Sequence, residues 1–307
     1  MHDHHGHDHG VGAETEIRPL ALALALIVAF MVAEVALGIV ADSLALLSDA
    51  AHMLVDAAAL GISVWAARLA RRPAGGRMTF GFRRAEILSA QANGATLLVL
   101  GLAIVVEGAR RLASPPEVEA PIVVFTAAAG AFVNVLALRQ VARANRSSLN
   151  VEGSYQHLLT DLYAFTATVI AGIVVWTTGF DRADPIASLA VAGSMLLAAW
   201  PLLRRSGRVL LEAAPEGLDP DEVAAALRRH AGVTDVHDLH VWEISSGFPA
   251  LSAHVLVERD GDCHAIRREL ERLLHERFGL DHTTLQVDHT SDRLLGISSL
   301  RTGRRNR

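Results

Sequence analysis

Three features of the sequence predict an α-helical membrane protein that ends in a small soluble α/β domain. Hydrophobic residues make up 51% of the 307 residues, which is too large a share for an ordinary soluble protein. Six apolar segments are each long enough to cross a hydrocarbon core of about 30 Å. After Leu211 charged residues become frequent again, and a compact soluble domain is expected there.

The six segments are defined by their length and by their scarcity of charge. Four of them contain no charged residue, whereas the first contains Glu34 and the second contains Asp49, His52 and Asp56. Each is expected to form one transmembrane helix. The predicted segments are 20–40, 43–69, 87–106, 121–138, 162–180 and 185–203.

The arginines between the segments predict the orientation of the chain. They cluster in every second connection and after the last segment, and positively charged connections stay in the cytoplasm. We therefore expect a multi-pass protein of the inner (cytoplasmic) membrane with both termini in the cytoplasm. The arginines on the cytoplasmic side are Arg68, Arg71, Arg72, Arg77, Arg83, Arg84, Arg139, Arg143, Arg146, Arg204, Arg205 and Arg208, against Arg110, Arg111 and Arg182 on the other side.

The remaining composition excludes several classes of protein. Cys263 is the only cysteine, so an internal disulfide framework and a cysteine-rich zinc knuckle are both excluded. The net charge of −5 averages over membrane and water and points to no charged partner, and no nucleic-acid partner is expected. No cleavable signal peptide is expected before the apolar run that begins at Pro19.

Both ends of the chain, residues 1–16 and 293–307, are predicted to be disordered. The first of them is rich in histidine, which is typical of a weak metal-binding tract and equally of a solvated tail. These histidines are His2, His4, His5, His7 and His9.

A histidine and a carboxylate recur four residues apart in two apolar regions. His52 precedes Asp56 in HMLVD, and His157 precedes Asp161 in HLLTD. Residues four apart lie on one face of an α-helix, so each pair offers a nitrogen and an oxygen ligand in the same direction. Two such faces supply the four ligands that Zn²⁺ accepts in a tetrahedral site, without the thiolates that hold structural zinc tightly.

The two pairs are predicted to lie at the same depth in the membrane. Asp56 is twelve residues before Arg68, and His157 is eleven residues after Arg146, so both lie roughly 17 Å from the cytoplasmic helix ends. A carboxylate at mid-membrane costs roughly 3 kcal/mol on insertion scales and needs a partner, which a bound dication would supply. The alternative is that each pair only forms a hydrogen bond within its own helix.

Other polar residues in the apolar segments have less specific interpretations. For Glu34 and Asp49 we favour a role in function or in organising the helices, since both are acidic. Gln91, Asn93 and Asn134 are expected to line an aqueous path or to join helices by hydrogen bonds, and the second role is favoured for the two asparagines.

The soluble domain, residues 212–292, is predicted to have the element order αββαβ. A helix over 221–230 follows an expected cap at Asp219, with Pro220 at the first helical position. Alternating patterns predict strands over 233–244 and 250–258. An amphipathic helix over 263–278 and a last strand over 284–288 follow.

Histidines in this domain indicate a second metal site. Strand ends that lie side by side would bring together His237, His254, His264 and Asp288. These residue types are suitable zinc ligands. Histidines at strand ends are also common without a metal, so the cluster alone leaves both interpretations open.

Four stretches of the sequence carry a resemblance to a known family. They are SLALLSDAAHMLVDAAAL at 43–60, the pair His157 and Asp161, HDLHVWEI at 237–244, and LSAHVLVE at 251–258. With these motifs the chain resembles the cation diffusion facilitator family, particularly its bacterial zinc-exporting branch. The resemblance implies a homodimer, six helices in each subunit, a ferredoxin-like cytoplasmic domain, and zinc efflux coupled to inward proton movement.

The resemblance also implies the roles of individual residues. It places the transport site on His52, Asp56, His157 and Asp161, and the cytoplasmic site on His237, His254 and Asp288, with His264 as a further candidate. Arg84 and Glu212 match a basic and acidic pair that locks the dimer in some members. The loop at 71–86 lacks the Asp and His that bind an additional zinc in some members, so no metal is predicted there. Gln286 replaces a histidine, which weakens the cytoplasmic site or shifts the ligand to His289.

The ligand chemistry predicts an exchange of metal ions for protons. A histidine must be neutral and a carboxylate ionised to bind Zn²⁺, so metal binding and protonation compete. Rocking of helices around a mid-membrane site would then give Zn²⁺/H⁺ antiport by a secondary active transporter, not by an enzyme. A histidine at position 52 favours Zn²⁺ over Mn²⁺ and Mg²⁺, while Cd²⁺, Co²⁺ and Ni²⁺ stay plausible cargo.

Three other functions fit the residues less well. An intramembrane metalloprotease would need a His-Glu-x-x-His helix, which the sequence lacks. A membrane-anchored metal sensor or regulator that uses the C-terminal domain would need no ligands at mid-depth. A zinc importer of unrelated fold would share the ligands and reverse the direction, so efflux rests on the resemblance.

Overall fold

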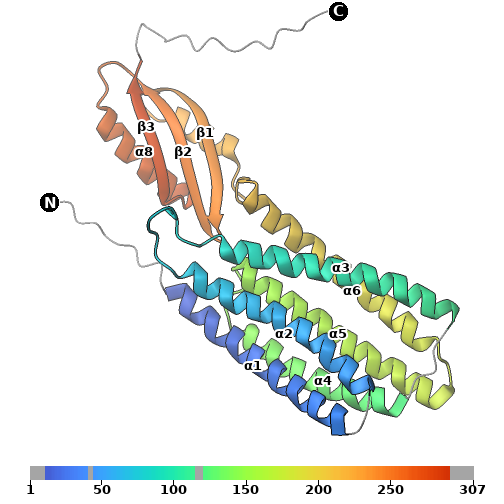
Figure 1. Ribbon diagram of the computed structural model, residues 1–307. Coiled ribbons are helices and arrows are strands. Elements are labelled where there is room, and N and C mark those ends of the chain that lie inside the picture. The colour runs from blue at the N-terminus through green and yellow to red at the C-terminus, as the bar shows by residue number, and fades with distance from the viewer. Residues whose placement is uncertain (1–10, 41–43, 115–119, 291–307) are drawn as a thin grey trace, which may run out of the picture. The chain divides into compact units, whose positions relative to one another are not determined.

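The computed structural model describes residues 11–40, 44–114 and 120–290, and its first six helices match the six predicted segments (Figure 1). Each contains a stretch that is long and apolar enough to cross a membrane, judged by length and composition. The prediction of six transmembrane helices is confirmed. The helices are α1 (Val11–Val40), α2 (Leu44–Ala70), α3 (Ala85–Ala113), α4 (Ala120–Val141), α5 (Leu149–Thr178) and α6 (Ala183–Leu210).

Helix α1 begins earlier than predicted. It starts at Val11, so the prediction of disorder over residues 1–16 is wrong for residues 11–16. This stretch contains alanine and glutamate, which have favourable helix propensities, and the polar composition concealed the helix start. Residues 1–10 with their five histidines, and the predicted tail at 293–307, lie outside the described residues.

Helix α5 also begins earlier, at Leu149 instead of residue 162. Its first turns contain the polar residues Asn150 and Ser154, so the predicted apolar segment did not extend to them. Both side chains are nonetheless buried in the structure. His157 and Asp161 consequently lie inside one continuous helix, as the count of residues from Arg146 assumed.

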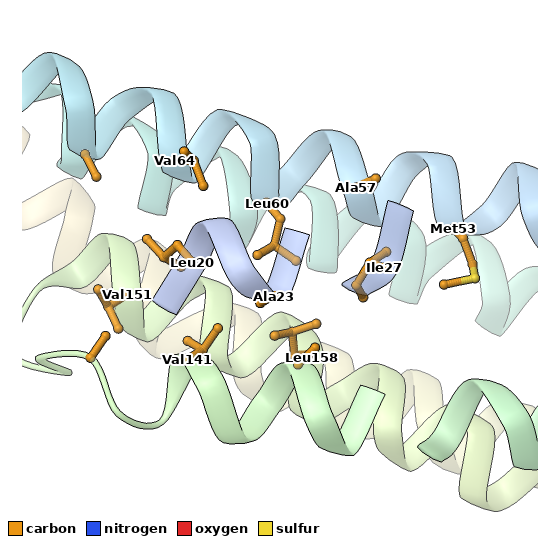
Figure 2. Close-up of a cluster of buried hydrophobic side chains, with 13 residues drawn as sticks. Leu20, Ala23, Ile27, Met53, Ala57, Leu60, Val64, Val141, Val151 and Leu158 are labelled. Carbon is orange, nitrogen blue, oxygen red and sulfur yellow. The ribbon is translucent and has the colours of Figure 1, made fainter. Parts of the chain in front are cut away.

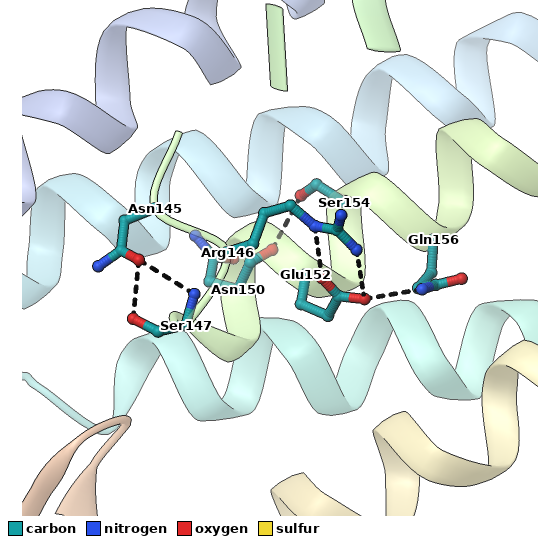
Figure 3. Close-up of polar contacts among 7 residues, drawn as sticks. All are labelled: Asn145, Arg146, Ser147, Asn150, Glu152, Ser154 and Gln156. Carbon is teal, nitrogen blue, oxygen red and sulfur yellow. Dashed lines mark hydrogen bonds and ion pairs between the residues drawn. The ribbon is translucent and has the colours of Figure 1, made fainter. Parts of the chain in front are cut away.

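Polar contacts with the preceding loop hold the start of α5 (Figure 3). Arg146 donates from Nε and Nη2 to the two carboxylate oxygens of Glu152, at 2.9 and 3.2 Å, and Gln156 donates to the same carboxylate at 2.7 Å. The Arg146 guanidinium also lies 3.8 Å from the ring centroid of Tyr155. A carboxylate in the first turn is favourable at a helix N-terminus, so these contacts stabilise a polar helix start.

Helices α1, α2, α4 and α5 pack around one apolar cluster (Figure 2). Leu20 and Ile27 of α1, Leu60 of α2 and Leu158 of α5 are almost completely buried in it. The cluster is completed by Ala23, Met53, Ala57, Val64, Ala67, Ala137, Val141, Ala144 and Val151. This core fixes α2 and α5 within one bundle.

Helices α3 and α6 form a closely packed pair. Three glycines of α3, Gly94, Gly101 and Gly108, are seven residues apart, and each faces a leucine of α6. The facing leucines are Leu203, Leu196 and Leu189. They are also seven residues apart, in the opposite direction along the chain, as expected for antiparallel helices in constant register. A Cβ atom added at any of the three glycines would come within 3.0 to 3.1 Å of the leucine side chain. Small residues therefore allow the close approach of these helices.

The described chain falls into two compact units, and the soluble domain belongs to the second. The helical unit extends to Ala213 and includes the turn Glu243–Phe248, while the second unit contains the rest of the chain from Ala214. The later elements are α7 (Pro220–Arg228), β1 (Val233–Ser245), β2 (Phe248–Val257), α8 (Cys263–Phe278) and β3 (His282–His289). The predicted order αββαβ is confirmed.

The three strands form a sheet in the order β1-β2-β3, with β2 and β3 parallel. On β2, Leu251, Ala253, Val255 and Val257 are buried, and they share a core with Leu270 and Leu274 of α8. The intervening residues, including His254, point to the more accessible face. Asp219 accepts a hydrogen bond from the backbone N–H of Asp221 at 2.9 Å, which confirms the predicted cap of α7.

Candidate intramembrane metal site

Three of the four residues predicted for the membrane site meet between α2 and α5. His157 Nε2 lies 3.2 Å from Asp56 Oδ1 and 3.8 Å from Asp161 Oδ2. One ligand atom from each residue lies within 4.8 Å of the others. All three residues are buried, with 4, 2 and 8% exposure for Asp56, His157 and Asp161. Two carboxylates and an imidazole are thus enclosed within the helical unit.

Helical periodicity and the apolar core bring these groups together. His157 and Asp161 are four residues apart on α5 and therefore share one face. Asp56 lies on α2 next to Ala57, which belongs to the apolar cluster together with Leu158 (Figure 2). The sequence neighbours of Asp56 and His157, Ala57 and Leu158, thus pack in the same apolar core. His52 lies one turn before Asp56 on α2, and its side chain is outside the described part of the structure.

The donor set fits a divalent cation. Within the described residues, His157 Nδ1 and Asp161 Oδ2 are buried and have no hydrogen-bond partner. Buried polar atoms are normally satisfied, so unsatisfied atoms in a carboxylate and imidazole cluster suit a bound ion. A mixed nitrogen and oxygen set is appropriate for Zn²⁺ and similar transition metals. The arrangement differs from the alternative of isolated intrahelical pairs, because the shortest contact joins two helices.

Other polar residues in the membrane helices are also buried. Glu34, Asn93 and Asn134 are buried. Asn93 donates to the hydroxyl of Ser63 at 3.1 Å, which agrees with its predicted role in joining helices. Asp49 lies outside the residues whose side chains are described.

A second cluster of potential ligands lies on the sheet of the soluble domain. His237 and His254 have ring centroids 5.3 Å apart, and Asp238 joins them in a group whose ligand atoms lie within 4.8 Å of one another. The structure places the other two predicted residues outside this group. The backbone N–H of His264 bonds to Asp262 at 3.0 Å, and Asp288 accepts a hydrogen bond from Gln286 at 2.8 Å.

Asp238 was not predicted as a ligand, and its position depends on a break in the strand pattern. Val236 and Val241 both face the core although they are five residues apart, which a regular two-residue alternation does not allow. Asp238 has a positive φ of 48°, as at a β-bulge, where one extra residue shifts the alternation. The shift lets His237 and Asp238 both join the group. The odd spacing of Val236 and Val241 was the signal in the sequence.

The remaining predicted residues are placed as follows. Arg84 donates to Glu212 at 3.0 Å, so the basic and acidic pair is in contact within one chain. Both side chains are substantially exposed, and such a pair contributes at most about 1 kcal/mol to stability. His289 Nε2 lies 2.9 Å from the carbonyl oxygen of Gly261, so this ring nitrogen is already in a hydrogen bond.

The six helices and the buried carboxylate and imidazole cluster define a class of protein. Ionisable side chains buried within membrane helices carry a high free-energy cost of insertion. They are typical of proteins that move ions across the bilayer. The chain is therefore a multi-pass membrane protein whose helical bundle encloses a candidate ion site.

Comparison with known families identifies the family of this membrane protein. Residues 20–211 match the model described as the cation efflux transmembrane domain, and residues 215–290 match the model of the cation efflux protein cytoplasmic domain. The chain belongs to the cation efflux family of transporters, also called the cation diffusion facilitators. It is therefore a transporter and not an enzyme, and the predicted family resemblance is confirmed.

Several relatives match almost the whole chain. The metal cation efflux system protein CzcD of Cupriavidus metallidurans is 35% identical, over 92% of this chain and 89% of the relative. The cadmium, cobalt and zinc/H(+)-K(+) antiporter of Bacillus subtilis is 33% identical, over 92% of each chain. The zinc transporter ZitB of Escherichia coli is 34% identical, over 93% of this chain and 92% of the relative.

A solved structure is also similar to part of the chain. It is the metal-bound C-terminal domain of the CzcD transporter from Cupriavidus metallidurans, with 30% sequence identity. The match covers 23% of this chain and 99% of that domain, with a TM-score of 0.23.

Proposed function

We propose that this protein exports Zn²⁺ from the cytoplasm in exchange for H⁺, by secondary active antiport with alternating access. The transport site consists of Asp56, His157 and Asp161, together with His52. The observation that carries the proposal is the buried contact of 3.2 Å between Asp56 and His157, which joins the two motif-bearing helices into one site.

The charges of the site explain why metal and protons would exchange. Two ionised carboxylates carry two negative charges in a region of low polarity, where uncompensated charge is costly. A dication neutralises them. When the ion leaves, protons take its place on the same oxygen and nitrogen atoms, so loading with one species releases the other.

The relatives support the direction of transport and the choice of ion. The names of two relatives describe cation efflux and antiport against H⁺ and K⁺, and a third is named a zinc transporter. An imidazole ligand favours Zn²⁺ over Mg²⁺ and Mn²⁺, and it equally suits Cd²⁺, Co²⁺ and Ni²⁺. Zn²⁺ is accordingly the proposed main cargo, and the other three are proposed as further cargo.

The soluble domain is proposed to sense the same metal. His237, Asp238 and His254 would bind a regulatory Zn²⁺ on the accessible face of the sheet. This domain lies in the cytoplasm if both termini do, as the arginine distribution favours. Two copies of the chain would form a homodimer in the lipid bilayer.

The experiment that tests the proposal is zinc flux into proteoliposomes under an imposed pH gradient. Asp56→Asn removes one charge from the proposed site with little change in shape. Glu107→Gln is its matched control, because Glu107 is a carboxylate of α3 that pairs with Arg111 on the exposed surface, at 2.8 Å. Asp56→Asn should abolish gradient-driven flux, and Glu107→Gln should transport as the parent does.

The same experiment separates the transporter from a membrane-anchored metal sensor. A sensor would show no gradient-driven flux in the parent protein and would bind zinc only through the soluble domain. Normal flux in Asp56→Asn would instead show that the buried cluster is structural, and would refute the proposed transport site.

A further inference from the structure

A second contact joins α2 and α5 about two helical turns away from the metal site. Asn150 of α5 donates from Nδ2 to the backbone carbonyl of Ser63 on α2, at 2.9 Å. Both residues are completely buried. Figure 3 shows Asn150 in the first turn of α5, where its own carbonyl accepts from Ser154 at 3.1 Å.

The two contacts between α2 and α5 share one helical register. Ser63 follows Asp56 by seven residues, and Asn150 precedes His157 by seven residues. Seven residues are almost two turns, or roughly 10 Å along each axis, so both contacts use the same faces of both helices. Antiparallel helices keep such paired spacing only if they do not slide against each other. The Asn150 contact and the Asp56–His157 contact are therefore linked by rigid helix on both sides.

The acceptor of the Asn150 hydrogen bond is a backbone carbonyl of α2, so the bond acts on the helix and not on a side chain. Asn93 of α3 also reaches Ser63, but it donates to the side-chain hydroxyl, at 3.1 Å, and not to the backbone of α2. Asn150 binds the backbone of α2, so its bond restrains the position of the helix itself. The bond to Ser63 uses only the amide nitrogen, and the amide oxygen Oδ1 has no hydrogen-bond partner in the described residues. An apolar side chain would fill this place without an unsatisfied oxygen, so packing alone does not account for asparagine.

We propose that Asn150 is a positioning residue for the transport site. By bonding to the Ser63 carbonyl it fixes α2 against α5 in the register that brings the Asp56 carboxylate to His157 and Asp161. It touches no metal ligand itself and acts through the position of Asp56. The inference rests on the proposed function, because it assumes that Asp56 binds the transported ion.

The test is equilibrium Zn²⁺ binding to the full chain in detergent, measured by competition with a fluorescent chelator. All proteins carry His237→Ala and His254→Ala, so that the second cluster does not contribute. Asn150→Leu removes the donor at similar volume and should weaken Zn²⁺ binding at least tenfold. Asn93→Leu is the matched control, since it removes a buried asparagine that donates to the same residue from a different helix. It should change the affinity less than threefold.

A double-mutant cycle distinguishes positioning from a general structural effect. Asp56→Asn alone should weaken binding strongly, and adding Asn150→Leu to it should weaken binding at most twofold further. If both backgrounds lose the same factor, or if Asn93→Leu equals Asn150→Leu, Asn150 does not act through Asp56 and the inference is overturned. If Asp56→Asn binds as the parent does, the proposed transport site itself fails.

The behaviour of the variants in solution completes the test. Each variant is first checked for a monodisperse, folded species, and Asn150→Ala replaces Asn150→Leu if the latter does not fold. If neither folds while Asn93→Leu does, Asn150 is a residue of overall stability, and the positioning role is rejected.

Discussion

The imidazole of His157 lies 3.2 Å from the carboxylate of Asp56, although 101 residues separate them in the chain. The contact joins the two copies of a repeated motif, one on α2 and one on α5. Because both residues are buried, an ionised Asp56 carboxylate needs a compensating positive charge beside it. Several measurable consequences follow from this arrangement and from the packing around it.

Zinc should stabilise the protein through this site. In a protein with His237→Ala and His254→Ala, Zn²⁺ at one hundred times its Kd should add about 2.7 kcal/mol to the free energy of unfolding. The reason is that the ion binds the folded state only. The measurement is the Tm with and without Zn²⁺ in detergent. The shift should vanish in Asp161→Asn and persist in Glu107→Gln, and a shift that survives Asp161→Asn would contradict the site.

Close packing of α3 against α6 should make Gly101 intolerant of a large side chain. A Cβ at this position would lie 3.1 Å from Leu196, so Gly101→Leu should overpack the pair and destabilise the protein by about 1–3 kcal/mol. Thermal unfolding in detergent gives the change. Gly193→Leu on α6 is the control, because no atom lies within 4 Å of a Cβ placed there. Equal destabilisation by both substitutions would show that the glycine and leucine register is unimportant.

Substitution of Asp238 should have opposite effects on metal binding and on the stability of the soluble domain. Asp238 has a φ of 48°, a conformation that glycine adopts without strain. Asp238→Gly should therefore raise the Tm of the metal-free protein slightly while it weakens Zn²⁺ binding by the second cluster. Asp238→Asn tolerates the same backbone and should weaken binding without raising the Tm. Calorimetric titration in an Asp56→Asn background measures the binding, and unchanged affinity in both variants would exclude Asp238 as a ligand.

The cap of α8 should make the domain less stable in acid. The Asp262 carboxylate accepts hydrogen bonds from the backbone N–H groups of Ala265 and His264, both at 3.0 Å, and these bonds lower its pKa below the ordinary value of 3.8. A lowered folded-state pKa means that the stabilisation is fully present above pH 3.8. It is lost as the pH falls through the lower value.

Replacement of this cap gives a direct test. Asp262→Ala should lower the Tm at neutral pH by a few degrees, and the difference from the parent should shrink at acid pH. Asp260→Ala, a nearby exposed carboxylate, serves as the control and should leave the Tm unchanged. A difference between Asp262→Ala and the parent that stays constant into acid would show that the carboxylate does not act as the cap.

The sequence by itself determined the six spans, the element order of the soluble domain and the residue types of the candidate membrane site. These features depend on local patterns. Hydrophobic length defines a span, two-residue and 3.6-residue periods define strands and helices, and residues four apart on a helix always share a face. That is why His157 and Asp161 could be paired in advance, and why Asp219 could be placed as a cap.

Only the tertiary structure decided which residues meet across elements. The start of α5 at Leu149 was concealed because Asn150 and Ser154 are polar, and their burial depends on packing between helices, such as the bond from Asn150 to Ser63 of α2. Asp238 entered the second cluster through a bulge, whereas Asp288 and His264 stayed outside it. Distances between elements arise from register and backbone irregularity, which depend on packing between segments far apart in the sequence and not on any local pattern.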